Sequence, residues 1–252
     1  MKIGGNVIND QVRLISFLDD FSAVKGHKLL VHGGGRRATD LASSLGLQTK
    51  MVAGRRITDE EGLEVVTMVY AGLLNKKIVA GLQAVECNAL GMSGADGNSI
   101  VAHKRTGSEI DYGFAGDIDR VDASMIASLL NAGLTPVFCA ITHDCKGQLL
   151  NTNADTIASE LARSLCDDFE VELIYCFEKE GVLEDLENET SVIEHMNLEK
   201  FHEMKNRAQI SEGMLPKLQN SFDALKNGVA RVIIGHPELL KDADRKHTEL
   251  TL

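Results

Sequence analysis

The chain has 252 residues, 44% of them hydrophobic and 25% charged, which suffices for one large domain or two closely fused lobes. Its formal net charge of −11 disfavours nucleic acid and anionic membranes as partners. The five cysteines are widely spaced and form no C-x-x-C pair, which predicts reduced thiols in a cytoplasmic protein and neither disulfides nor a zinc site. We find no run of about 18 to 20 apolar residues, the length of a membrane span, and no secretory signal.

Short apolar runs alternate with longer helical patterns along the chain. Buried strands are predicted at residues 28–32, 135–140, 171–176 and 229–234. Helices are predicted between them, from apolar residues at three- and four-residue spacing. The alternation predicts an α/β fold with a mainly parallel sheet and helices on both faces.

Two segments carry more specific local signals. Thr58 and Glu61 have the spacing of a capping box, which predicts a helix with Thr58 as its N-cap. Residues 100–104 and 109–114 flank a turn-like segment at residues 105–108. A β-hairpin is therefore predicted between these two runs.

Lys2 stands just before Gly4 and Gly5, at a predicted strand-to-helix turn. Glycine lets the backbone approach a ligand closely and point N–H groups at it, and a phosphoryl group beside a lysine suits such a turn. The alternative is an ordinary turn with an exposed lysine. A central strand needs about five residues, so either this strand is short or the natural chain begins further upstream.

A second glycine cluster, Gly33-Gly34-Gly35, follows the apolar run at residues 28–32. A helix predicted at residues 36–45 adds its N–H groups and its positive end to this anion cradle. No G-K-[ST] follows, so this is not a Walker A loop, and the absence of G-x-G-x-x-G disfavours a dinucleotide. We interpret His32 as a packed or hydrogen-bonded residue at the strand end and not as a base.

Charged and amide side chains recur at three later turns. Arg56, just before a helix, can grip a carboxylate with two parallel N–H groups, although a solvated arginine pair is equally compatible. Asn153 has the position of a helix N-cap, which leaves Asn151 and Asp155 unexplained; a carboxylate there can orient two lysines. Lys217 lies in or near the first turn of a predicted helix, where a cation opposes the helix dipole, and this indicates a compensating anion.

Together these motifs resemble the amino-acid kinase family and, within it, the acetylglutamate kinases. The resemblance covers nearly the whole chain, through K-x-G-G, H-G-G-G, G-x-R-x-T, G-x-D-G, N-x-N-A-D and G-M-x-x-K at residues 2–5, 32–35, 54–58, 94–97, 151–155 and 213–217. It implies a three-layer αβα sandwich with a mainly parallel central sheet and two lobes. Residues 1–252 would form a single amino-acid kinase domain, with an acylglutamate-binding lobe over residues 1–150 and an ATP-binding lobe over residues 151–252.

The activity implied by the resemblance is ATP-dependent phosphorylation of the γ-carboxylate of N-acetyl-L-glutamate to N-acetyl-L-glutamyl 5-phosphate, a cytoplasmic step of arginine biosynthesis. ATP with Mg²⁺ would be the co-substrate, with the metal held by the nucleotide phosphates and by no protein residue. No prosthetic group is implied. A homodimer is expected, as in relatives without an additional N-terminal helix, with neither nucleic acid nor membrane as a partner.

The resemblance also implies roles for individual residues. Lys2 and Lys217 would flank the transferred phosphoryl group, and Asp155 would hold both lysines. The substrate is expected at Gly34, Gly35, Arg56 and Asn151, and the phosphate loop at Gly4, Gly5 and Gly33. Nucleotide contacts are expected at Glu178, Lys179, Glu180, Gly181, Val182, Leu183, Gln209, Ile210 and Ser211. The segment F-E-K-E-G at residues 177–181 departs from the usual S/T-D-V-x-G, which leaves the adenine contacts open.

Two other functional classes compete with this interpretation. One is a non-catalytic relative that senses an amino acid or a nucleotide; the presence of all three expected catalytic residues disfavours it. The other is a different small-acid kinase, such as carbamate kinase, which the N-x-N-A-D motif and Arg56 disfavour.

A third alternative keeps the reaction but changes the acyl group to succinyl. Arg55 beside Arg56, and Arg36 beside the glycine cluster, are additional cations that an acetyl group does not require. A second buried carboxylate would need such a partner, because an unpaired buried charge is costly. In the simpler interpretation Arg36 and Arg55 face solvent or pair with acidic residues such as Asp40 or Glu60.

Overall fold

The structure is a computed structural model that describes residues 1–52, 55–107, 109–207, 209–210, 214–242 and 244–252. Its strands are β1 (Lys2–Ile3), β2 (Leu30–His32), β3 (Lys50–Val52), β4 (Arg55–Ile57), β5 (Ala89–Met92), β6 (Ile100–Lys104), β7 (Gly116–Val121), β8 (Thr135–Cys139), β9 (Ile141–His143), β10 (Leu149–Asn151), β11 (Glu172–Cys176), β12 (His195–Asn197), β13 (Arg231–Gly235) and β14 (His247–Thr251). The α-helices are α1 (Gly5–Asn9), α2 (Gln11–Ala23), α3 (Gly35–Ser44), α4 (Glu60–Thr67), α5 (Asn75–Ala84), α6 (Ala123–Asn131), α7 (Ala154–Ser164), α8 (Leu198–Asn206) and α9 (Leu215–Lys226). A π-helix η1 (Met68–Leu74) joins α4 to α5, and η2 (Asp96–Asn98) and η3 (Pro237–Leu240) are short 3₁₀ turns.

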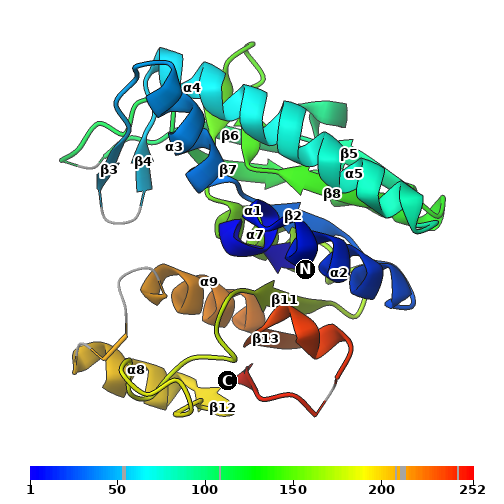
Figure 1. The fold of residues 1–252 in the computed structure, drawn as a ribbon, viewed down its shortest axis with the longest axis vertical. Helices are drawn as coiled ribbons and strands as arrows, with labels where there is room; N and C mark the ends of the chain where they lie inside the picture. The colour runs from blue at the N-terminus through cyan, green and yellow to red at the C-terminus, as the bar shows by residue number, and fades with distance from the viewer. Residues whose placement is uncertain (53–54, 108, 208, 211–213, 243) are drawn as a thin grey trace.

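An eight-stranded sheet crosses the molecule in the order β12-β14-β13-β11-β1-β2-β8-β5. The six strands from β13 to β5 are parallel, while β14 runs antiparallel to β13 and carries β12 parallel to itself. A four-stranded sheet, β10-β9-β6-β7, and the β3-β4 pair complete the strands. In Figure 1 the β3-β4 pair, β6 and β7 lie in the upper part, and β12 and β13 in the lower part.

Helices cover both faces of the large sheet. Lys2 pairs with Tyr175, and Ile3 pairs with His32, so the members of each pair share a face and the two pairs face opposite ways. On the first face the Tyr175 hydroxyl donates to the carbonyl oxygen of Asp155 in α7, and α7 packs on α9. On the second face His32 contacts Asn75 of α5, which packs on α2. This arrangement agrees with the predicted αβα sandwich.

The central strands are aliphatic, short and fully enclosed. β1 has only two residues, but Ile3 is completely buried and the strand is paired on both sides, by β11 and β2. Ile3, Leu30 and Val31 belong to one continuous apolar core. The predicted strands at residues 28–32, 135–140, 171–176 and 229–234 appear as β2, β8, β11 and β13, each shifted by at most two residues.

The predicted hairpin is wrong in its second strand. β6 occupies residues 100–104 as predicted, but its antiparallel partner is β7 at Gly116–Val121 and not residues 109–114. The intervening segment pairs elsewhere: Phe114 N–H donates to Thr58 O, and Asn151 N–H donates to Phe114 O. Residues 109–114, which the local pattern placed in the hairpin, are therefore bonded to segments that are distant in the sequence. Ser108, in the predicted turn, lies outside the described residues.

The predicted capping box at Thr58 is also wrong. Helix α4 is capped by Asp59, whose carboxylate accepts from Gly62 N–H at 2.8 Å. Thr58 is fully buried, bridges to Gly113, and accepts from the Asn151 side chain through its hydroxyl. Thr58 is thus engaged in a tertiary contact, and the cap moves one residue along the chain.

One helical segment, although interrupted by charged residues, has the length and the average hydropathy of a membrane span. The run Glu60–Ala84, through α4, η1 and α5, has a mean hydropathy of 1.3 over its best window, 44% of which is buried. Val66, Val69 and Ile78 of this run lie in the apolar core, so packing against the sheet accounts for its composition. A core helix satisfies the same criterion, and the segment is weak evidence for a membrane.

Candidate active site

The described glycine turns meet at the carboxyl ends of the parallel strands. Gly4 follows β1, Gly33 follows β2 and Ala140 follows β8, and these three strands are consecutive in the sheet. Ligands of open α/β sheets bind beyond the carboxyl ends of the strands. A cavity of about 250 Å³ opens at this edge. It is lined by Lys2, Gly4, Gly5, Gly33, Gly34, Gly35, Met51, Arg55, Arg56, Tyr70, Arg105, Ala115, Gly116, Ala140, Asn151, Thr152, Asn153, Ala154 and Asp155.

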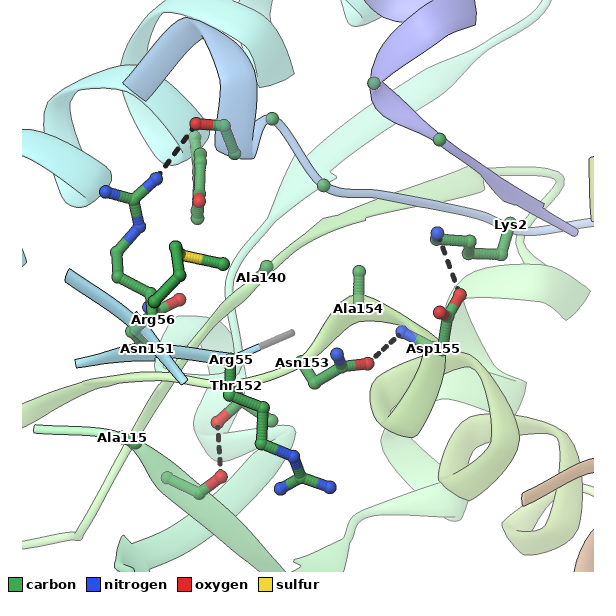
Figure 2. Close-up of a pocket in the computed structure, with 18 of the residues that line it drawn as sticks. Lys2, Arg55, Arg56, Ala115, Ala140, Asn151, Thr152, Asn153, Ala154 and Asp155 are labelled. Carbon is green, nitrogen blue, oxygen red and sulfur yellow. Dashed lines mark hydrogen bonds and ion pairs between the residues drawn. The ribbon is translucent and has the colours of Figure 1, made fainter. Parts of the chain in front are cut away.

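A single carboxylate oxygen joins two lysines at the inner end of this cavity. Asp155 Oδ1 lies 2.8 Å from Lys2 Nζ and 3.1 Å from Lys217 Nζ. Figure 2 shows the Lys2 ammonium reaching from its turn to the Asp155 carboxylate at the start of α7. The three side chains come from β1, α7 and α9, and only 9–20% of their surface is exposed. The structure thus brings together the three residues predicted to form the catalytic set.

Local structure explains how Asp155 is held. Asn153 is the N-cap of α7, and its side-chain oxygen accepts from the N–H groups of Asp155 and Thr156 at 2.8 and 3.2 Å. Asp155 therefore lies in the first turn, where the positive end of the helix dipole favours a carboxylate. Lys217 lies in the first turn of α9 with Pro216 beside it, and its ammonium lies 4.8 Å from the Tyr175 ring centroid.

Burial and charge shift two of these groups in opposite senses. Burial raises the pKa of Asp155, but the charges of Lys2 and Lys217 outweigh it and hold that pKa well below its usual range. Burial, and then the charge of Lys2, lower the pKa of Lys217 to about 8, although Asp155 opposes the shift. Two lysines on one carboxylate leave one net positive charge when both are protonated. The cluster can therefore attract an anion.

Lys217 also lines a second cavity, of about 370 Å³. The further lining residues of this cavity are Phe177, Glu178, Lys179, Gly181, Val182, Leu183, Leu186, Gln209, Ile210 and Met214. Lys2 and Asp155 line the first cavity. The lysine–aspartate cluster therefore lies at the junction of the two cavities.

Most of the predicted nucleotide residues line this second cavity, and one does not. Glu180 is held by Arg245, whose Nε and Nη2 donate to the two carboxylate oxygens at 2.7 and 2.6 Å, and it is not among the lining residues. The prediction for Glu180 as a nucleotide contact is not supported by its position. Ser211 lies outside the described residues. Phe177 and Met214, which lie in quoted motifs but had no role assigned, also line the cavity, as does Leu186, which no motif contains.

The second glycine cluster leaves no room for a side chain at its middle residue, Gly34. Gly33 lies against Ala154 at the start of α7, and a Cβ on Gly34 would come within 2.3 Å of Leu74 Cδ1. Helix α3 begins at Gly35, so its N-terminal N–H groups open toward the cavity. Within the described residues, the Gly34 N–H has no backbone acceptor. N–H groups at such a helix start, next to Lys2, are suited to holding an anion.

Arg56 lines the same cavity with its charge unneutralised. Its guanidinium donates to three neutral oxygens, those of Thr49, Thr39 and the Gly35 carbonyl, at 2.8–2.9 Å. No carboxylate of the described residues forms an ion pair with it. In Figure 2 the side chains of Arg56 and Arg55 extend in opposite directions. A positioned arginine without an anionic partner is suited to binding a carboxylate of a ligand.

Asn151 is held at the cavity wall by one end of its amide. Its Nδ2 donates to the Thr58 hydroxyl at 2.9 Å. Its Oδ1 therefore remains as an acceptor on the cavity side, where it can receive an N–H group of a ligand.

The two additional arginines separate in the structure. Arg55 is half-buried, lines the cavity, and extends from β4 away from Arg56 in Figure 2. Arg36 is exposed and does not line the cavity. Neither forms an ion pair with Asp40, Glu60 or any other described acidic residue. Arg36 therefore agrees with the simpler interpretation, in which it faces solvent, and Arg55 is the one of the two that lines the cavity.

Tyr70 and Arg105 also line the cavity, and sequence inspection missed both. Tyr70 is presented by the π-helix η1, a local irregularity that apolar spacing does not reveal. Arg105 donates through Nε to both oxygens of Asp117 at 3.0–3.1 Å, and stacks 5.6 Å from the Tyr112 ring. Residues 105–108 have the composition of a turn, so the local pattern does not indicate that Arg105 lies at the cavity.

No group of three or more histidine, cysteine, aspartate or glutamate side chains suited to a metal ion occurs in the part of the chain that the structure describes. Asp155 is the acidic residue that lines the first cavity, and both lysines engage it.

Comparisons with known proteins agree with this architecture. The amino acid kinase family matches residues 1–236. A protein of Bacteroides thetaiotaomicron named acetylglutamate kinase is 52% identical over 242 residues, covering 96% of this chain and 94% of that protein. N-acetylglutamate synthase from Neisseria gonorrhoeae, solved with coenzyme A and N-acetylglutamate, has a TM-score of 0.85 at 20% identity, over 100% of this chain and 58% of that one. Carbamate kinase from Giardia lamblia has a TM-score of 0.69 at 12% identity, over 99% and 96%; the last two likenesses concern the fold alone.

The αβα sandwich and these relatives define the protein as a kinase on a mainly parallel sheet. Because the family covers nearly the whole chain and the bacterial relative is 52% identical, the chain belongs to the amino acid kinase family.

We predict that one lysine ammonium titrates near pH 8 and that it belongs to Lys217. Carbon-13 NMR of ε-labelled lysines should detect it apart from ordinary lysines, which titrate near pH 10.4. Asp155→Asn removes a charge that raises the pKa of Lys217, so this titration should move below pH 8 in that variant.

Two substitutions assign the signal. Lys217→Arg should abolish it, whereas Lys226→Arg, at the exposed end of the same helix, should leave it in place. A signal that survives Lys217→Arg, or that moves upward in Asp155→Asn, would contradict the assigned electrostatics.

Proposed function

We propose that the protein transfers the γ-phosphoryl group of ATP to the γ-carboxylate of N-acetyl-L-glutamate, forming N-acetyl-L-glutamyl 5-phosphate in arginine biosynthesis. The observation that carries the proposal is the pair of lysines on one oxygen of Asp155, at the junction of two cavities. The bacterial relative named acetylglutamate kinase supports the choice of acceptor, since its match extends over 96% of this chain.

The chemistry requires alignment and positive charge more than acid–base catalysis. A carboxylate oxygen attacks the γ-phosphorus, the bond from that phosphorus to the bridging oxygen breaks, and ADP leaves with the electron pair. The attacking carboxylate, with a pKa of about 4.3, is already ionised near neutral pH, so no proton is transferred. Lys2 approaches from the first cavity and Lys217 from the second, so both can face the phosphoryl oxygens. Asp155 holds the two ammonium groups at fixed positions relative to each other.

The first cavity suits an N-acylated glutamate. Arg56 offers a positioned cation for the α-carboxylate, and the free Oδ1 of Asn151 offers an acceptor for the amide N–H that acylation creates. Gly34 and Gly35 carry N–H groups for the acceptor carboxylate or the phosphoryl group, and Gly4, Gly5 and Gly33 complete the loop. The chain would thus act as a single domain, with residues 1–150 mainly holding acylglutamate and residues 151–252 mainly holding ATP.

The second cavity suits the nucleotide. Apolar Val182, Leu183 and Ile210 can enclose a base, and Lys179 lies at the rim in an ion pair with Glu189. The described residues hold no cluster of metal ligands, and Asp155 is occupied by lysines. Mg²⁺ would therefore arrive with ATP as part of the substrate, bound to its phosphates. We place the enzyme in the cytoplasm, where a biosynthetic kinase finds ATP.

A second candidate acceptor is N-succinyl-L-glutamate, and the position of Arg55 favours it. This half-buried arginine lines the first cavity, and no described carboxylate pairs with it. A terminal carboxylate on the acyl group would supply the missing partner, which an acetyl group lacks.

We further propose a homodimer formed at the β5 edge of the sheet. No described strand pairs with the outer side of β5, where Leu90 is 38% exposed. Met68 and Leu73 of η1, which leads into the helix packed on β5, are 53% and 38% exposed. An open sheet edge next to exposed apolar side chains is suited to pairing with a second copy.

The first prediction from the proposed function concerns catalysis. Wild-type protein should release ADP and form a hydroxylamine-trappable acyl phosphate with N-acetylglutamate, and far less with glutamate or carbamate. Lys2→Ala and Lys217→Ala should each lower kcat by about 100-fold or more with little change in KM, because each cation acts mainly on transition-state charge.

Lys226→Ala is the matched control, since it removes an exposed lysine from the helix that carries Lys217 and should leave kcat unchanged. Absence of ADP release by the wild type would favour the sensor alternative. Near-normal turnover in either active-site variant would refute the assigned role of that lysine.

The second prediction separates the two acyl groups. If Arg55 receives an acyl carboxylate, kcat/KM for N-succinylglutamate should exceed that for N-acetylglutamate, and Arg55→Leu should reduce the ratio by about 10-fold or more. Arg36→Ala should leave the ratio unchanged, since Arg36 lies outside the cavity. A wild type that prefers the acetyl substrate, or a ratio unaffected by Arg55→Leu, would leave N-acetylglutamate as the acceptor.

The third prediction concerns assembly. Light scattering should give the mass of two chains, and the double variant Met68→Glu/Leu90→Lys should give the mass of one, because both charges would be buried at the contact. Val12→Lys, at a 78% exposed position on α2, should remain dimeric. A monomeric wild type would refute the dimer, and a dimeric double variant would place the contact elsewhere.

A further inference from the structure

His32 lies directly beneath the glycine cluster on the face of the sheet away from Lys2. The side chain is fully buried, and both ring nitrogens have partners. Nδ1 lies 2.8 Å from the carbonyl oxygen of Gly33, and Nε2 lies 3.1 Å from the side-chain nitrogen of Asn75. These two contacts connect the last residue of β2 to the first residue of α5.

The partners of His32 determine which nitrogen carries the proton. A carbonyl oxygen can only accept, so Nδ1 donates to Gly33. Asn75 Nδ2 donates to Nε2 and also to the carbonyl oxygen of Val137 at 2.8 Å, which fixes the orientation of the amide. Burial lowers the pKa of His32 to about 4, so the ring stays neutral near pH 7. His32 is thus a neutral imidazole that serves as donor on the side of the glycine cluster.

The bond from His32 acts on the neighbouring peptide through covalent geometry. The carbonyl of Gly33 and the N–H of Gly34 belong to one trans peptide unit, so they point in opposite directions. When Nδ1 holds the carbonyl toward the α5 face, the Gly34 N–H points toward the opposite face. That face carries Lys2, α7 and the cavity lined by Gly33 and Gly34. Glycine itself cannot impose this orientation, because its backbone rotates freely.

We propose that His32 is a positioning residue for the proposed phosphoryl transfer: its Nδ1–H fixes the Gly33–Gly34 peptide so that the Gly34 N–H is aimed at the transferred phosphoryl group. Asn75 sets the tautomer from the other side of the ring. His32 itself contacts neither substrate, and its contribution reaches the reaction only through the peptide. The inference rests on the proposed kinase reaction, and it concerns a residue that lines neither of the two cavities.

Two amide substitutions separate the two hydrogen bonds of His32. In His32→Asn, the amide nitrogen is as many bonds from Cα as Nδ1, so it can keep the bond to Gly33 and lose the one to Asn75. In His32→Gln, the amide oxygen is as many bonds from Cα as Nε2, so it can keep the bond to Asn75 and lose the one to Gly33. His32→Leu loses both. The experiment measures kcat and KM with MgATP and N-acetylglutamate, together with the free energy of unfolding in urea.

We expect His32→Gln and His32→Leu to lower kcat by about 10- to 100-fold with KM within about 3-fold, since a misdirected donor costs transition-state stabilisation. His32→Asn should recover kcat to within about 3-fold of wild type. The order of kcat among the three variants should differ from the order of their free energies of unfolding. If Asn and Gln lose activity equally, or if kcat falls in proportion to unfolding free energy, His32 is only a packing residue and the proposal fails.

A measurement without substrate keeps this test separate from the proposed function. Nitrogen-15 NMR of the imidazole should show His32 protonated on Nδ1 at every pH from 5 to 9. A proton on Nε2 would overturn the inference whatever the enzyme phosphorylates. A wild type that carries the Nδ1 proton but does not act on N-acetylglutamate would refute the acceptor; the same variants would then be assayed for ADP release with N-succinylglutamate.

Discussion

The Asp155 carboxylate is the point on which the remaining site depends. Two lysines share one of its oxygens in a place where each ammonium is about nine-tenths buried. Without that carboxylate, two like charges would repel each other in a poorly solvated site, where unpaired charge is costly. The low pKa of Asp155 reflects the same interaction, because the lysines outweigh the burial of its charged form. A two-residue strand, the first turn of α7 and the first turn of α9 all converge on this one group.

The parallel sheet explains why the convergence occurs where it does. Strands β1 and β2 end side by side, so their glycine turns meet at one edge. The side chains on the two faces of these strands have different roles. Lys2 and Tyr175 face α7 and α9, where the cations lie, whereas Ile3 and His32 face α5, where packing and the imidazole hold the backbone in place. Because side chains alternate along a strand, Lys2 points to the face that carries the charged cluster and Ile3 points to the face that holds the backbone in place.

The site is locally positive in a protein with a net charge of −11. Lys2, Arg55, Arg56 and Arg105 line the first cavity, while Asp155 is its acidic lining residue and Asp117 pairs with Arg105. Arg56 is held by neutral oxygens, which position a cation without neutralising it. Such an arrangement concentrates anions at the cavity while the acidic surface repels other polyanions. It is consistent with a small anionic metabolite and a nucleotide as ligands.

The sequence by itself determined the alternation of strands and helices, the two glycine turns, the Asn153 cap and the candidate lysines and aspartate, because these depend on local chemistry or on a motif. Tertiary structure alone decided the features governed by distant partners. Thr58 pairs with Gly113 and Asn151 instead of capping α4, and the run after β6 leaves the hairpin for the same contacts. The two additional arginines differ in the same way, since Arg55 lines the cavity and Arg36 is exposed, and Glu180 pairs with Arg245. Sequence spacing does not encode which side chain meets a partner sixty or more residues away; only the packed chain brings those atoms together.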